Sequence, residues 1–307
     1  MEGFMKTLGR SAALAVLGLF LLAGSARAEI RETTLTAAAT TWEITPSQRV
    51  TAWAYNGTVP GPVIRAIPGD TIRVTLVNKL SEATTIHWHG VPVPNGMDGV
   101  PGITAPVVPP GGSFVYEFPA PAPGTYWYHP HHDSASQISR GLYGLLVVDP
   151  PEKNWDREVP IVIGEFGRMA GAMGGTRGMG GMGGTNGGMG SAMMAGTLLI
   201  NGKTAPAIPE LRVKKGERVL FRMVNTGNMV HPMHVHGMRW EILATDGFAL
   251  NQTYAKDTLP LNAGERYDGL LVADNPGRWL VHCHNLEHVG ESGVSMTGLA
   301  FELVVEE

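Results

Sequence analysis

The sequence predicts an all-β protein built from two Greek-key β-sandwich domains. Short runs rich in β-branched and aromatic residues, such as residues 71–77 and 269–273, are separated by Gly/Pro turns and indicate strands. After the first 28 residues, no long stretch shows the 3.6-residue periodicity of a helix. Strands recurring at this spacing are typical of sandwiches, and 307 residues that are 43% hydrophobic suffice for two cores of ordinary size.

A change of composition divides the chain into two halves. Residues 167–196 consist almost entirely of Gly, Met, Ser, Thr and Ala, which cannot form a packed core. The halves also repeat one pattern, in which an Asn-Gly turn is followed by prolines, a strand that ends in Asn, and a histidine cluster. We therefore expect domains at residues 29–150 and 197–307, joined by a linker at 151–196.

The N-terminus resembles a signal peptide. Lys6 and Arg10 precede an apolar run at residues 12–23, and small residues at Ala26 and Ala28 suit a cleavage site. An uncleaved membrane anchor is the alternative, but the run is shorter than the ~20 residues that cross a bilayer. We expect residues 1–28 to be removed from an exported protein, periplasmic or secreted, with no later membrane span. The formal charge of −4 gives no reason to expect nucleic acid as a partner.

Eight of the eleven histidines form pairs spaced two residues apart. Residues i and i+2 of a strand point to the same side, so each pair presents two imidazoles on one face. One such pair could be two surface histidines on an edge strand, but four pairs together favour metal binding. The pairs are His87/His89, His129/His131, His234/His236 and His282/His284.

Cys283 is the only cysteine, so no intramolecular disulfide can form. It lies between His282 and His284, and on a strand its sulfur points away from both imidazoles, so one tripeptide can contact two metal sites. A thiolate, two imidazoles and a weak axial thioether form an electron-transfer copper site, and His231, Cys283 and His288 supply the first three. The alternatives for Cys283 are an inert buried thiol and a nucleophile paired with a histidine. The alternative metal is zinc. Ten histidines with one cysteine exceed one or two zinc sites.

Four segments resemble the copper motifs of multicopper oxidases, in the order of that family. They are His-Trp-His-Gly at 87–90, His-Pro-His at 129–131, His-Pro-Met-His-Val-His-Gly at 231–237 and His-Cys-His-Asn-Leu-Glu-His at 282–288. Further segments look like the laccase and bacterial cuprous-oxidase branch. The resemblance covers nearly the whole chain after residue 28 and implies cupredoxin-like domains with four copper ions per functional unit: one type 1, one type 2 and two type 3.

The resemblance also implies a role for each ligand. His87 and His234 would bind type 2 copper, and His231, Cys283 and His288 type 1 copper. Only His132 is left over, as a neighbour of the site. The ligands of the type 3 pair would be His89, His129, His131, His236, His282 and His284.

This sequence departs from the family pattern around the type 1 site. The axial methionine usually follows the last histidine by five residues, but that place is Gly293 here. We expect Met296 to be the axial ligand, after a three-residue insertion. Relatives often place an acid directly after the last histidine, where this chain has Val289, and neither Glu287 nor Glu291 is assigned that role.

The resemblance implies an oxidase. A reducing substrate, Cu(I) or a phenol, would give single electrons to type 1 copper, and the electrons would pass through Cys283 to His282 and His284. Four electrons would reduce O2 to water. Asp98 matches the acid that assists the type 2 side in relatives, and its alternative is an ordinary turn aspartate.

Three-domain members have a middle domain that this chain lacks between its two halves. The chain is therefore similar to two-domain laccases. In those relatives the trinuclear cluster forms between neighbouring subunits, which implies a homotrimer. A flexible linker of ~30 residues could instead let both domains of one chain meet. Residues 169–194 contain seven of the fifteen methionines, which favours capture of Cu(I) over a plain linker because thioethers are soft donors.

Two other functions compete with an oxidase. A copper-binding protein of copper tolerance, without turnover, would not need a complete trinuclear ligand set. A copper nitrite reductase is also a two-domain trimer, but it has its type 1 site in the first domain and lacks His-Cys-His. The position of Cys283 near the C-terminus argues against it.

Overall fold

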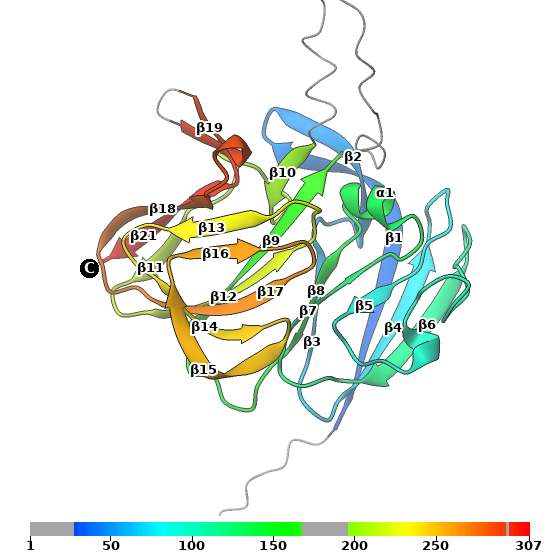
Figure 1. The fold of residues 1–307 in the computed structure, drawn as a ribbon. Coiled ribbons are helices and arrows are strands. Elements are labelled where there is room, and N and C mark those ends of the chain that lie inside the picture. The colour runs from blue at the N-terminus through cyan, green and yellow to red at the C-terminus, as the bar shows by residue number, and fades with distance from the viewer. Residues whose placement is uncertain (1–27, 168–195, 293–294) are drawn as a thin grey trace, which may run out of the picture.

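A computed structural model describes residues 28–167, 196–292 and 295–307 of the chain (Figure 1). The expected signal peptide up to residue 27 and nearly all of residues 167–196, the Gly/Met segment, lie outside the described residues. No helix in the described ranges is both long enough and apolar enough to cross a membrane. The described chain is almost entirely β, with cupredoxin-like sandwiches as the sequence predicts.

The first sandwich packs two four-stranded sheets against each other. On its strands alternate residues turn inward, so that Ile72, Val74 and Leu76 of one strand are buried. One sheet has the order β2 (Gln48–Tyr55), β1 (Ile30–Thr45), β4 (Thr71–Asn78) and β6 (Ser113–Pro119). The other has the order β3 (Gly61–Ala66), β8 (Gly144–Val148), β7 (Gly124–His129) and β5 (His87–His89).

The second sandwich packs a six-stranded sheet against a five-stranded sheet. The larger has the order β10 (Thr197–Ile200), β9 (Arg157–Phe166), β12 (Arg218–Asn225), β17 (Arg266–Val272), β14 (Trp240–Thr245) and β15 (Phe248–Lys256). The smaller has the order β11 (Leu211–Lys214), β21 (Ala300–Glu306), β18 (Gly277–Cys283), β13 (His231–Val235) and β16 (Thr258–Leu261). Short elements complete the described chain: α1 (Ser134–Ser139), the 3-10 helices η1 (Asn95–Met97) and η2 (Leu286–His288), and the hairpin of β19 (Val289–Ser292) and β20 (Ser295–Gly298).

Strand β9 lies within residues 151–196, where the sequence predicts a linker. It pairs in parallel with β12 and antiparallel with β10, where Phe166 lies opposite Thr197. Its residues 161–165 are buried, because both faces of the strand are covered. The Gly/Met segment therefore connects two paired strands of the second sandwich, and the junction between the sandwiches lies between β8 and β9.

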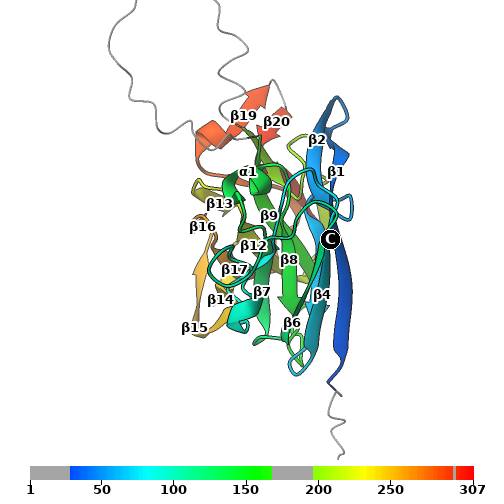
Figure 2. The ribbon, with the colours of Figure 1, turned by 90° about the vertical axis from the view of Figure 1, so that its right-hand side faces the viewer.

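The two sandwiches share a packed and hydrogen-bonded interface. Trp127 and Leu145 of the first sandwich belong to one buried cluster with Val162 and Val224 of the second. Figure 2 shows the layers edge-on, with β1 and β4 on one side, β8 and β9 between, and β13 and β16 on the other. This packing joins the two sandwiches through buried side chains.

Candidate metal centres

The sulfur of Cys283 and two imidazoles meet inside the second sandwich. The Cys283 Sγ lies 3.5 Å from the Nδ1 of His288 and 3.9 Å from the Nδ1 of His231, and the two nitrogens are 3.0 Å apart. All three side chains are buried. We call His231, Cys283 and His288 the thiolate group. Its donor atoms converge on one point, as binding of a single cation requires.

Local backbone contacts fix the loop that carries His288. The amide of Cys283 donates to the carbonyl of Leu299, and the amide of Leu299 donates to the carbonyl of His288. The side chain of Asn285 caps η2 by accepting from the amide of Glu287. The ring of His288 is thereby tied to the end of β18, beside the sulfur.

The donor chemistry of the thiolate group suits copper. Burial raises the pKa of the Cys283 thiol to about 11, so ionisation at neutral pH requires a bound cation. A thiolate with two imidazoles is the set that copper electron-transfer sites use. The residues present therefore fit the metal that the sequence predicts.

A second cluster, the first quartet, lies on the first sandwich and consists of His87, His89, His129 and His131. Donor atoms of the first three lie within 4.8 Å of one another. The ring of His131 packs edge-on against that of His87 at a centroid distance of 5.4 Å. Strands β5 and β7 pair with His87 opposite His129, which brings the two sequence motifs together.

Burial keeps two rings of the first quartet in the neutral form. It lowers the pKa of His129 to about 3 and that of His89 to about 4, with smaller contributions from neighbouring positive charges. A neutral imidazole has the free lone pair that a metal needs. His131 is exposed, so the quartet opens to the surface of the sandwich. The next residue in the chain, His132, is half-buried.

The second quartet consists of His234, His236, His282 and His284 on β13 and at the end of β18. The Nε2 atoms of His236 and His282 are 3.1 Å apart, and the ring of His234 lies 5.6 to 5.7 Å from those of His282 and His284. His234 pairs with His282 across the two strands. Because side chains alternate, this quartet lies on the outer face of the sheet whose inner face carries the Cys283 sulfur.

The two quartets remain separate within one chain. His236 and His284 are exposed, as His131 is on the first quartet. No ring contact joins the two quartets in the described part of the chain. The second sandwich nevertheless reaches His89 at Gly264, where an added Cβ would lie 3.0 Å from the ring. Each quartet thus resembles half of a larger site, open toward solvent.

Asp98 contacts the first quartet directly. It ends η1, and its backbone carbonyl lies 2.9 Å and its carboxylate 3.2 Å from the Nδ1 of His87. Both contacts engage Nδ1, so Nε2 is the ring nitrogen whose lone pair remains for a metal. The position of Asp98 at the end of η1 also agrees with the alternative role as a turn aspartate.

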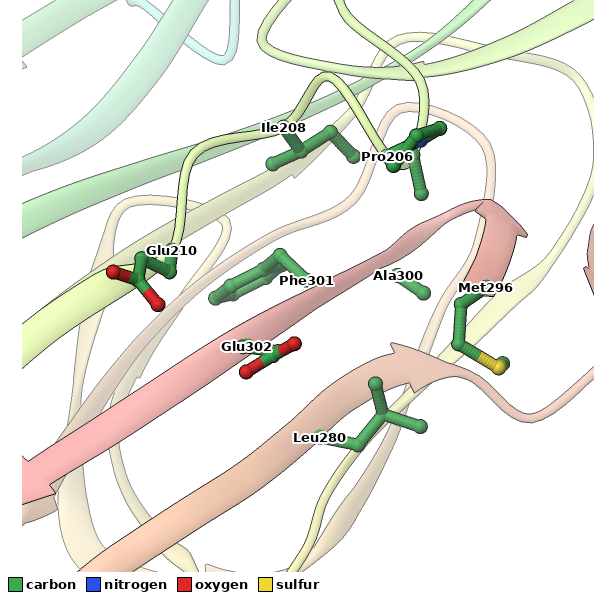
Figure 3. A pocket seen from close by; sticks show the side chains of 9 residues that line it. Pro206, Ile208, Glu210, Leu280, Met296, Ala300, Phe301 and Glu302 are labelled. Atoms are coloured by element: carbon green, nitrogen blue, oxygen red, sulfur yellow. The ribbon is translucent and has the colours of Figure 1, made fainter. Parts of the chain in front are cut away.

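Met296 lines a cavity of about 290 Å³ on β20. Figure 3 shows its side chain there, beside Leu280 of β18 and Ala300 of β21. Leu280 lies on the face of β18 opposite to that of Cys283, because the two are three residues apart on a strand. The assignment of Met296 as axial ligand stays a prediction.

Glu165 belongs to the site, although no sequence motif predicts it. Its carboxylate Oε1 lies 3.6 Å from the Nε2 of His231, and both side chains are buried. The one available signal is an acid at the end of the apolar run of β9. That signal carries little weight alone, because the run falls in the expected linker.

The fold and the donor sets together define a copper protein of two cupredoxin-like sandwiches. Two family models for multicopper oxidases match the chain, at residues 36–153 and 184–303. The chain belongs to the multicopper oxidase family.

Individual relatives agree with this family. The structure resembles that of the blue copper oxidase from Nitrosomonas europaea, with a TM-score of 0.78 and 30% identity over 90% of this chain and 86% of that one. The chain is 34% identical to multicopper oxidase MmcO of Mycobacterium tuberculosis over 73% of its length and 48% of the relative's. It is 28% identical to a copper resistance protein A homolog of Pseudomonas syringae pv. tomato over 86% of its length and 51% of the relative's. The chain thus spans about half the length of these curated relatives.

Proposed function

We propose that this chain is an exported oxidase, periplasmic or secreted, that couples one-electron oxidation of Cu(I) or a phenol to the four-electron reduction of O2 to water. The observation that carries this proposal is the position of Cys283. Its sulfur belongs to the thiolate group, while its two sequence neighbours, His282 and His284, belong to the second quartet. Three consecutive residues therefore connect a one-electron site to a histidine-rich site.

Different residues of the chain serve the two kinds of site. Copper, when bound, supplies one-electron redox chemistry at the thiolate group and the reduction of O2 at the histidines. Type 1 copper would be held by His231, Cys283, His288 and Met296, type 2 copper by His87 and His234, and the type 3 pair by the other six quartet histidines. Burial of the thiolate group excludes water from the sulfur. Asp98 orients His87 and can hold a proton next to the first quartet.

A trinuclear site needs both quartets, and we propose that two copies of the chain unite them. Three rings, those of His131, His236 and His284, are exposed in the single chain, which suits closure by another subunit. A head-to-tail contact of this kind generates a closed ring when the rotation between subunits closes, and we propose a homotrimer.

The substrate is proposed from two features. One is the similarity to a copper resistance protein A homolog, and the other is the methionine content of the Gly/Met segment, which lies outside the described residues. Phenols are the second candidate, because a one-electron acceptor at the thiolate group suits them equally.

Copper loading of the purified protein tests the proposed function. We expect a blue thiolate absorption band, a near-ultraviolet type 3 shoulder and O2 uptake with Cu(I) or a phenol. A Cys283→Ser variant should lose the blue band and the O2 uptake. Copper binding without O2 uptake would instead indicate a copper-binding protein without turnover, and nitrite reduction would indicate a nitrite reductase.

The substrate preference has its own test. Deletion of residues 169–194 should impair turnover of Cu(I) more than turnover of a phenol if the methionines capture Cu(I). A matched variant that replaces the seven methionines of this segment by leucine, with its length kept, separates thioether chemistry from chain length. Equal losses on both substrates would refute Cu(I) capture without touching the oxidase proposal.

A further inference from the structure

The buried carboxylate of Glu165 faces the thiolate group from the far side of His231. The Nδ1 of His231 points toward Cys283 and His288, so the proton of the neutral ring belongs on Nε2. That nitrogen has no hydrogen-bond acceptor within bonding distance in the described part of the chain. The Glu165 Oε1 lies 3.6 Å from it, so a negative charge faces the N–H dipole beyond hydrogen-bond length.

The backbone holds this carboxylate in place. The amides of Asn228 and Met229 both donate to the Glu165 Oε1, each at 2.7 Å. A Cβ at Gly227 would lie 2.4 Å from the same oxygen, so the absence of a side chain there makes room for it. The loop from β12 to β13 thus folds around the carboxylate directly before it delivers His231.

We propose that Glu165 is a positioning residue that orients His231 and tunes the reduction potential of type 1 copper. The inference rests on the type 1 assignment made above. A fixed negative charge beyond the imidazole stabilises the higher charge of Cu(II) relative to Cu(I). Its charge also favours the proton on Nε2, the nitrogen that faces it, and thereby leaves the Nδ1 lone pair for the metal. Strand β9 of the larger sheet in this way acts on a site carried by the smaller sheet.

A Glu165→Gln variant tests the proposal, since it keeps an oxygen for the two amides and removes the charge. In the copper-loaded protein we expect a higher midpoint potential in a redox titration of the blue band, and roughly 10–100-fold weaker Cu(II) binding. Asp70→Asn is the matched control, because Asp70 is also buried and accepts backbone amides, but in the first sandwich. The control should keep the wild-type potential.

The outcomes separate the two proposals. Wild-type protein without a blue band would refute the type 1 assignment itself. A blue wild type and a folded Glu165→Gln variant with the same potential and affinity would overturn the role of Glu165 alone. If Glu165→Gln does not fold, Glu165→Asp keeps the charge one methylene further away and should show altered potential and affinity, and unchanged values would overturn the proposal. If neither variant folds, the carboxylate is required for the fold of the loop from β12 to β13, and the proposal is overturned.

Discussion

Asp98 holds the Nδ1 of His87 through two oxygens, its backbone carbonyl at 2.9 Å and its carboxylate at 3.2 Å. The carbonyl is the nearer of the two oxygens, so the ring keeps an acceptor when the carboxylate serves a further task. Its side chain is partly exposed beside the open first quartet. This arrangement suits an acid that delivers protons to the proposed site of O2 reduction.

Replacement of Asp98 by asparagine should therefore affect turnover more than metal binding. We expect O2 uptake to fall by roughly 10–100-fold, with the copper content unchanged, because the backbone carbonyl still orients His87. Copper analysis and O2-electrode rates on the same preparation measure both quantities. Asp133→Asn, at an exposed aspartate of the same sandwich, is the control. A wild-type rate of O2 uptake in Asp98→Asn would show that Asp98 is only a turn residue.

Mixing two inactive variants tests the assembly. His89→Ala removes a ligand from the first quartet, and His284→Ala removes one from the second. If the quartets of different copies meet in a ring, co-refolding the variants in equal amounts should restore about a quarter of the wild-type activity, because about one junction in four combines intact quartets. If one chain unites its own quartets, the mixture stays inactive.

Thr125 of the first sandwich makes buried hydrogen bonds to the second sandwich. Its hydroxyl donates to the buried carboxylate of Asp268 and accepts from Arg222 at 2.9 Å. Thr125→Val removes both hydrogen bonds, so Asp268 and Arg222 each lose one buried partner although they keep their own ion pair. We expect a loss of about 1–3 kcal/mol in the free energy of unfolding. Urea denaturation measures this loss. The exposed Thr51→Val, in β2, should change the midpoint little; an equal effect would contradict the interface role.

Asp70 should contribute to stability at moderate pH and not in acid. Burial opposes its ionisation, but hydrogen bonds from Arg31 and from the backbone of Ile67 and Glu29 outweigh burial and lower its pKa. An acid with a lowered pKa stabilises the fold above its unfolded pKa of about 4 and loses that contribution as the pH falls through the folded value.

Urea midpoints measured across this range of pH provide the test. The wild type should lose stability more steeply in acid than Asp70→Asn does. Asp274→Asn, at an exposed position, should keep the wild-type slope. Parallel slopes for wild type and Asp70→Asn would show that the ion pair with Arg31 has no net effect.

The fold class and the grouping of the histidines could be predicted because both depend on local periodicity. Side chains alternate on a strand, so the pairs at His87/His89 and His282/His284 had to share a face, with Cys283 on the other side. The strands β5 and β7, or β13 and β18, then needed only to pair for the quartets to form.

The position of β9 illustrates what local patterns do not contain. The run at residues 161–165 is apolar enough for a buried strand, but its sequence does not indicate which strands it pairs with. Its pairing with β12 and β10 depends on contacts between residues far apart in the chain. The same holds for Met296, whose place beside Leu280 follows from the packing of the β19–β20 hairpin.

The sequence by itself determined the β architecture, the donor types and the face on which each donor lies, because these follow from composition and a two-residue repeat. Only the tertiary structure decided which strands are neighbours, that Glu165 stands behind His231, and that each chain presents two open quartets. Those relationships are set by long-range packing, in which each contact depends on the whole arrangement of the sheets.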